Sequence, residues 1–102
     1  MSDLLAPTAY LKRLLILHVL SYGAASGRGV SITVGQRTRN AEFFYPGEVY
    51  RLLRGLVEAG IVRMVAPEER TRISVLYYLT SEGRHLLLEE RALLAAALDL
   101  NS

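Results

Sequence analysis

Apolar and polar residues recur at helical spacing in the middle of the chain. Between Pro46 and Gly60, a rotation of about 100° per residue separates two helix faces. The apolar face is formed by Val49, Leu52, Leu53, Leu56 and Val57, and the opposite face by Glu48, Arg51, Arg54, Gly55 and Glu58. Pro46 suits a first helical turn and Gly60 suits a left-handed helix end. The pattern predicts a short amphipathic helix with a buried side and an arginine-bearing side.

A helix is also predicted near the N-terminus, over residues 9–22, with Thr8 as its N-cap and Gly23 at its end. Its apolar residues lie on several sides: Leu11, Leu15, Val19 and Tyr22 on one, Ile16 and Leu20 on another, with Leu14 and Leu17 beside them. A helix that is apolar on most sides must be buried on most sides, and a small domain covers only one. The apolar surface that the domain leaves uncovered predicts contact with a second subunit. We interpret His18 as a packed histidine.

The last helix is predicted over residues 81–100, with Thr80 as its N-cap and Glu82 near its positive end. Apolar residues line two neighbouring faces: Leu86, Leu93, Ala97 and Leu100 on one, and Leu87, Leu94 and Leu98 on the other. Left in water they would form an exposed apolar patch, so we expect a homodimer. The candidate dimerisation residues are Leu14, Leu17, Leu86, Leu87, Leu93, Leu94, Ala97 and Leu98.

Two strand-like runs, residues 61–66 and 73–79, predict a hairpin whose link, residues 67–72, contains a proline and five charged or polar residues. Arg70 and Arg72 near its tip could reach phosphate or a minor groove. The adjacent Glu68 and Glu69 favour the alternative interpretation, a solvated loop without a DNA contact.

Two stretches resemble the PadR-like winged helix-turn-helix regulators. In the central helix the matching positions are Pro46, Gly47, Tyr50, Leu53, Leu56, Gly60, Ile61 and Val62. The second stretch is YYLTSEGRHLL, residues 77–87, at the expected distance downstream. The resemblance covers most of the chain from about Tyr10 onward. It implies a fold that is mainly α with a small β-hairpin wing (α+β), a C-terminal dimerisation helix, and a DNA-binding transcriptional regulator that is usually a dimer.

The segment between the first two predicted helices admits more than one interpretation. Residues 23–29, GAASGRG, read as a flexible turn, because the Lys-Ser/Thr pair of a phosphate-binding loop is missing. In residues 30–44, Val30, Ile32 and Val34 alternate with polar residues, which favours a strand. The resemblance favours a short helix over about residues 29–38, and we adopt the helix. After it, an apolar run is expected to anchor the central helix: Phe43, Phe44 and Tyr45.

Length and composition indicate one domain, residues 1–102, divided into a winged-helix core (8–80) and the last helix (81–100). The 102 residues are 51% hydrophobic and include no cysteine, which excludes disulfides and cysteine-based zinc sites and fits a cytoplasmic protein. No apolar run approaches the roughly 18 residues of a membrane span, and the N-terminus lacks the basic start of a secretory signal. No membrane association is expected.

Charge is unevenly distributed along the chain. The net charge is +2, but residues 28–72 carry eight arginines against five glutamates, whereas the last thirty residues are net negative. Positive charge therefore collects around the predicted recognition helix and wing, as expected for a nucleic-acid binder. Eleven of the twelve cations are arginine, which suits forked contacts with phosphate and guanine.

These observations favour a dimeric regulator that binds double-stranded DNA at a pseudo-palindromic site. Arg51 and Arg54 are the main candidates to read base edges or phosphates. The full candidate set is Arg37, Arg39, Gly47, Glu48, Tyr50, Arg51, Arg54, Arg70 and Arg72. An architectural protein that coats DNA, and a winged helix used only for protein interaction, are the alternatives. No catalytic or metal-binding constellation is visible, so neither enzymatic activity nor a cofactor is expected, and the sequence locates no effector site.

Overall fold

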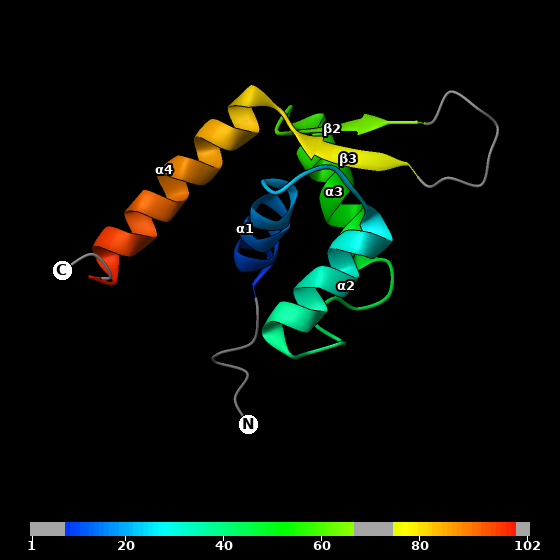
Figure 1. Cartoon of the computed structure of the whole chain (residues 1–102), viewed down its shortest axis with the longest axis horizontal. Helices are drawn as coiled ribbons and strands as arrows, with labels where there is room; N and C mark the ends of the chain where they lie inside the picture. Colours follow the sequence, from blue (N-terminus) through cyan, green and yellow to red (C-terminus); the bar gives the residue numbers. More distant parts are fainter. Residues whose placement is uncertain (1–7, 67–74, 100–102) are drawn as a thin grey trace.

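The computed structural model describes residues 8–66 and 75–99. In chain order the elements are α1 (Ala9–Leu20), β1 (Ala25–Ser26), α2 (Gly27–Thr38), α3 (Glu48–Glu58), β2 (Val62–Val65), β3 (Leu76–Leu79) and α4 (Ser81–Ala97). Helices α1, α2 and α3 gather below a small sheet, the β2–β3 hairpin points to one side, and α4 leaves on the other (Figure 1). The predicted class, mainly α with a small β-hairpin wing (α+β), is confirmed.

The sheet has three antiparallel strands in the order β1-β3-β2. In the predicted hairpin, Val62 pairs with Leu79 and Val65 pairs with Leu76. Strand β1 was not predicted, and the expectation of a plain flexible turn over residues 23–29 is wrong. Its Ala25 pairs with Tyr77, so the strand depends on a partner about fifty residues away. Two residues are too few to show a strand period in the sequence.

The core receives at least one side chain from every helix. It consists of Ile16, Leu17, Val19, Leu20, Val30, Val34, Phe43, Phe44, Val49, Leu52, Leu53, Leu56, Val62, Leu79 and Leu87. Phe43 and Phe44 are buried as expected, but Tyr45 is about half exposed and does not belong to this core. All four helices and the sheet therefore pack around one core.

Helix α1 begins where the sequence predicts and ends earlier. The Thr8 side chain accepts a hydrogen bond from the Leu11 amide at 3.2 Å, so the predicted N-cap is confirmed. The helix ends at Leu20, and Tyr22, expected as its last residue, is exposed. His18 is half-buried with its ring edge-to-face on Tyr22 at 5.3 Å, which agrees with its interpretation as a packed histidine.

Helix α2 confirms the helical interpretation of residues 29–38 and begins two residues earlier than predicted. The Ser26 side chain caps it by accepting a 3.0 Å hydrogen bond from the Gly29 amide. Val30 and Val34, one turn apart, are both fully buried, whereas Ile32 between them is about half exposed. Burial of this helical pair overrides the β propensity that favoured a strand.

Helix α3 begins at Glu48, after Gly47 in a left-handed conformation (φ 82°). Pro46 therefore lies before the helix, and its predicted place in the first turn is wrong. The predicted end is confirmed, with Gly60 at φ 77°. The Gly60 and Ile61 amides donate 3.0 Å hydrogen bonds to the Val57 and Leu56 carbonyls, which closes the helix in a Schellman motif.

Helix α4 is tied to the end of α3 through its N-cap. The Thr80 hydroxyl accepts a hydrogen bond from the Gly83 amide at 3.0 Å, as predicted, and lies 2.7 Å from the Gly60 carbonyl oxygen, to which it donates. Only the first part of α4 enters the core, through Leu87. The helix ends at Ala97, three residues before the predicted end, and residues 100–102 lie outside the described residues.

Candidate nucleic-acid interface

The exposed side of α3 carries the arginines that the helical pattern predicts. Arg51 and Arg54 are exposed, and so are Gly55 and Glu58, while the predicted apolar face is buried except for the half-buried Val57. The structure shows no hydrogen bond or ion pair between Arg54 and another described residue. Its guanidinium is therefore available to an external ligand, on a helix held rigidly by the core.

Glu48 does not lie on this exposed face, and that part of the prediction is wrong. Only 5% of its side chain is exposed, and Lys12 Nζ on α1 lies 2.7 Å from its Oε1. The same oxygen accepts a 3.2 Å hydrogen bond from the Tyr45 amide. A projection of α3 alone places Glu48 beside Arg51, but the polar side of its first turn is covered by α1. The carboxylate thus faces Lys12 rather than solvent.

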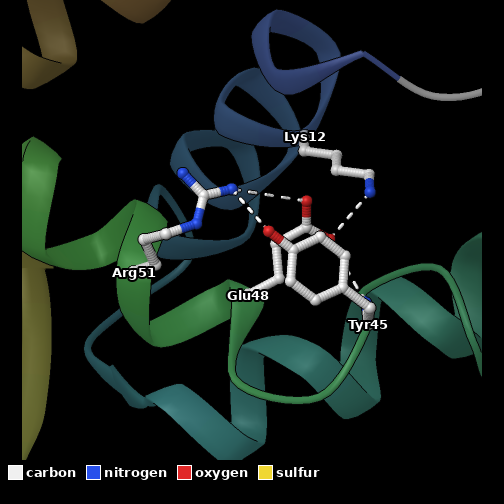
Figure 2. Close-up of polar contacts among 4 residues, drawn as sticks. All are labelled: Lys12, Tyr45, Glu48 and Arg51. Carbon is white, nitrogen blue, oxygen red and sulfur yellow. Dashed lines mark hydrogen bonds and ion pairs between the residues drawn. The ribbon is translucent and has the colours of Figure 1, made fainter.

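Arg51 is held at the edge of this buried pair (Figure 2). Its Nη2 donates a 2.8 Å hydrogen bond to the Tyr45 hydroxyl and lies 3.7 Å from Glu48 Oε2. The Arg51 side chain is nevertheless 60% exposed. Arg51 is therefore oriented by neighbours within the protein, whereas Arg54 projects from α3 with no partner among the described residues.

A groove of about 570 Å³ lies between α2 and the start of α3. Its lining includes Arg28 and Ser31 of α2, together with Tyr45, Gly47 and Tyr50. Tyr50, a predicted site residue, is about half exposed. The groove brings aromatic rings, one cation, Arg28, and one carboxylate, Glu42, to the same side as the first turns of α3.

Gly27 lets the Tyr50 ring lie against the start of α2, because a Cβ at residue 27 would collide with that ring. Arg28, the next residue, was missed by the sequence analysis, which placed it in a loop. The structure places Arg28 in the first turn of α2, because that helix begins at Gly27 with Ser26 as its N-cap.

Arg37 and Arg39 are not brought to this groove. Nine residues separate Arg37 from Arg28, so at about 100° per residue the two lie on opposite sides of α2. The Arg37 guanidinium lies over the Tyr22 ring at 5.4 Å, next to the end of α1. Arg39 is exposed at the left-handed end of α2 (φ 55°).

The predicted wing contacts Arg70 and Arg72, and the link that contains them, lie outside the described residues. On the described stem of the hairpin, Arg63 of β2 is exposed and lies 3.5 Å from the Tyr78 hydroxyl of β3, to which it donates a hydrogen bond. Arg63 is a further surface cation that the sequence analysis did not select.

Two of the predicted dimerisation residues are part of the protomer's own core. Leu17 and Leu87 are each 3% exposed, so assigning them to a free interface was wrong. The helical spacing of apolar residues does not indicate which apolar side of a helix packs against the protomer's own core. Of the other six, Leu14 and Leu86 are half-buried and pack against this core, Leu94 is half-buried, and Leu93, Ala97 and Leu98 are exposed.

The described part of the chain contains no group of three or more histidine, aspartate or glutamate side chains that could hold a metal ion. None of the helices in residues 8–66 and 75–99 is long and apolar enough to cross a membrane.

Solved transcriptional regulators share this fold. A transcriptional regulator from Clostridium thermocellum is 21% identical and superposes with a TM-score of 0.71, covering 98% of both chains. A PadR family transcription regulator from Clostridium difficile is 20% identical, with a TM-score of 0.72 and coverage of 87% of this chain and 92% of that chain.

Bacillus subtilis PadR, solved in complex with operator DNA, is 23% identical and has a TM-score of 0.63. That match covers 78% of this chain and 45% of the PadR chain. No protein-family model matches the sequence, and no curated protein matches it. The likeness therefore shows the winged-helix fold of PadR-type regulators, and what that fold does here rests on the residues it positions.

Proposed function

We propose that this protein is a DNA-binding transcriptional regulator whose α3 enters the major groove of double-stranded DNA. The observation that carries the proposal is the exposed face of α3, where Arg54 has no described partner and Arg51 is 60% exposed. Arginine forms bidentate contacts with guanine and charge-assisted contacts with phosphate. A regulator of this fold has been solved with operator DNA, which supports the same use here.

The groove beside α3 extends the proposed contact surface. Arg28 lines it from the first turn of α2, and Tyr50 lines it from α3. We propose that both lie close to the DNA backbone when α3 is in the groove, with the Gly47 backbone beside them. Glu48 is removed from the contact set, because its carboxylate is buried against Lys12.

The remaining arginines of the candidate set stay predictions. Arg70 and Arg72 are proposed to contact DNA from the wing. Arg37 and Arg39 would have to act at a separate place, at the end of α2, because Arg37 lies on the other side of that helix from the groove.

We further propose a homodimer formed through α4 and α1. Beyond Leu87, α4 has left the core, and Leu93 and Leu98 are 61% and 64% exposed. With Leu94 and Ala97, these two leucines belong to the apolar side of α4 that a second copy would cover, and Leu11 of α1, 40% exposed, would extend it. The site of action of such a regulator is the nucleoid, so we propose a cytoplasmic location.

Footprinting on DNA from upstream of the gene and on random DNA tests this function. A two-fold dimer should protect one bounded site with half-sites about 10 base pairs apart, and scrambling one half-site should abolish tight binding. The protein should bind the preferred site at least about a thousandfold more tightly than random DNA at physiological salt.

The two alternatives give different results in the same experiment. A protein that coats DNA would give protection that spreads with concentration from any starting sequence. A winged helix used only for protein interaction would show no salt-dependent DNA binding at all.

A further inference from the structure

Glu48 is shared unequally between two cations, and this sharing bears on how Arg51 meets DNA. Lys12 Nζ lies 2.7 Å from Glu48 Oε1, within hydrogen-bond distance. Arg51 Nη2 lies 3.7 Å from Glu48 Oε2, which is an ion pair without a hydrogen bond. The Lys12 side chain is only 12% exposed, whereas Arg51 is 60% exposed. Lys12 is therefore the fixed partner of the carboxylate and Arg51 the movable one.

A buried carboxylate requires a close cation, because an unpaired charge away from water is strongly unfavourable. Here Lys12 supplies that cation from α1, and the Tyr45 amide adds a second hydrogen bond to the same oxygen. If Lys12 were neutral, Arg51 would be the nearest replacement among the described residues. A shift of about 1 Å would bring its guanidinium into a charge-assisted hydrogen bond with Glu48. Arg51 would then be drawn towards the protein.

Tyr45 is the second residue that orients Arg51. Its hydroxyl accepts the 2.8 Å hydrogen bond from Arg51, and its ring lies 5.5 Å from Lys12 Nζ and 5.9 Å from the Arg51 guanidinium carbon (Figure 2). A contact with a neutral phenol is weaker than one with an ionised group, so phosphate can replace it. Guanine can also replace it, because O6 and N7 offer two acceptors to one guanidinium. Tyr45 thus holds Arg51 in an exchangeable contact.

We propose that Lys12, although it lies on α1, is a positioning residue for DNA recognition. It neutralises Glu48 and thereby leaves the Arg51 guanidinium available to DNA. This inference rests on the proposed function and adds a specific route, from α1 through Glu48 to Arg51, by which the first helix controls what the recognition helix presents.

The test measures DNA binding by Lys12→Met, Lys12→Met with Glu48→Gln, and Lys12→Met with Glu58→Gln, each against the site preferred by the wild-type protein. Lys12→Met should lose affinity by about 5- to 150-fold, the range for one lost base contact. Glu48→Gln should restore most of it, because no charge then captures Arg51. Glu58→Gln is the matched control: it removes the same charge from the exposed end of α3 and should restore little.

A double-mutant cycle separates this route from a direct contact of Lys12 with DNA. In the Arg51→Ala background, Lys12→Met should change affinity by less than about twofold, because residues that act through each other are not additive. Equal losses in both backgrounds, equal rescue by the two glutamate substitutions, or full affinity in Lys12→Met would overturn the inference.

Circular dichroism and thermal unfolding of each variant establish folding first. If Lys12→Met does not fold, Lys12→Gln replaces it, since a neutral amide can still donate a hydrogen bond to Glu48. The neutral pair Lys12→Met with Glu48→Gln should fold in either case. Wild-type protein without salt-dependent DNA binding would reject the proposed function and this inference together. Normal wild-type binding without the Lys12 effect would reject the inference alone.

Discussion

Gly83, in the first turn of α4, packs directly against the carbonyl oxygen of Ile61, with no room for a side chain between them. The contact fixes the start of α4 beside the end of α3, where Thr80 also bonds to the Gly60 carbonyl oxygen. Gly55 presents the opposite situation: it lies on the exposed face of α3, and a Cβ there would meet nothing within 4 Å. The two glycines therefore predict substitutions of opposite effect.

Gly83→Ala should destabilise the protein by about 1–3 kcal/mol, the usual cost of overpacking against atoms that cannot move away. Gly55→Ala should stabilise it by about 0.5–1 kcal/mol, because alanine is the better helix former in an open helical position. Chemical denaturation of both variants measures the free energies of unfolding. Equal effects of the two substitutions would contradict the packing described at Gly83.

Arg54→Ala should weaken binding to the preferred DNA site by roughly 1–3 kcal/mol if the side chain reads a guanine, with relaxed specificity at that base. If Arg54 contacts only phosphate, affinity should fall equally on all sequences and the salt slope should flatten by about one unit. Arg51→Ala is expected to behave in the same way. Titrations at several salt concentrations distinguish the two outcomes.

Arg84→Ala provides the control for that experiment, because it removes an exposed arginine of α4 that is not among the proposed contact residues. It should leave DNA affinity nearly unchanged. Full affinity in both Arg51→Ala and Arg54→Ala, with folding intact, would mean that α3 is not the recognition element.

Leu93→Glu should convert the proposed dimer into a monomer, because it places a charge on the exposed apolar side of α4. Ala92→Glu is the matched control, since at about 100° per residue position 92 lies away from the side that carries Leu93 and Leu98. Sedimentation at micromolar concentration reports the mass of each variant. A wild-type monomer would refute the homodimer, and dissociation by both substitutions equally would move the interface away from Leu93.

The pKa of His18 lies below its ordinary value of 6.5, because partial burial disfavours the charged imidazole and the positive charges of Arg91 and Arg37 add to that effect. The unfolded chain therefore binds the proton more readily than the folded one. The stability that neutral His18 contributes is present above pH 6.5 and is lost as the pH falls through 6.5 towards the lowered pKa.

His18→Gln should accordingly reduce the loss of stability between about pH 7.5 and about pH 5.5, because it removes a group that takes up a proton on unfolding. The measurement is the free energy of unfolding at both pH values. His85→Gln, an exposed histidine of α4, is the control and should preserve the wild-type difference. A His18→Gln protein with the full wild-type pH dependence would show that other groups cause it.

Features that local chemistry controls could be predicted from the amino-acid sequence alone. The Thr8 and Thr80 caps, the end of α3 at Gly60, and the apolar and arginine-bearing sides of α3 all follow from helical period and capping. Each depends on residues within a turn or two of one another, so a short window of sequence contains the information. The paired stretches of the hairpin were visible for the same reason.

Features that depend on distant partners could not be predicted and became visible in the folded chain. The helical period alone predicts that Glu48 is exposed. In the folded chain, α1 brings Lys12, 36 positions earlier, onto the first turn of α3 and buries the carboxylate. Lys12 itself carried a weak signal, since it and Arg13 are the only lysine or arginine residues in a predicted helix that is otherwise largely apolar.

Strand β1 and the assignment of Leu17 and Leu87 to the protomer's own core likewise required neighbours far along the chain. The residue type shows whether a side chain is apolar or charged. The helix or strand period shows on which side of its own element it lies. Burial and electrostatic pairing depend on which other element covers that side, and the covering element is chosen by the packing of the whole domain.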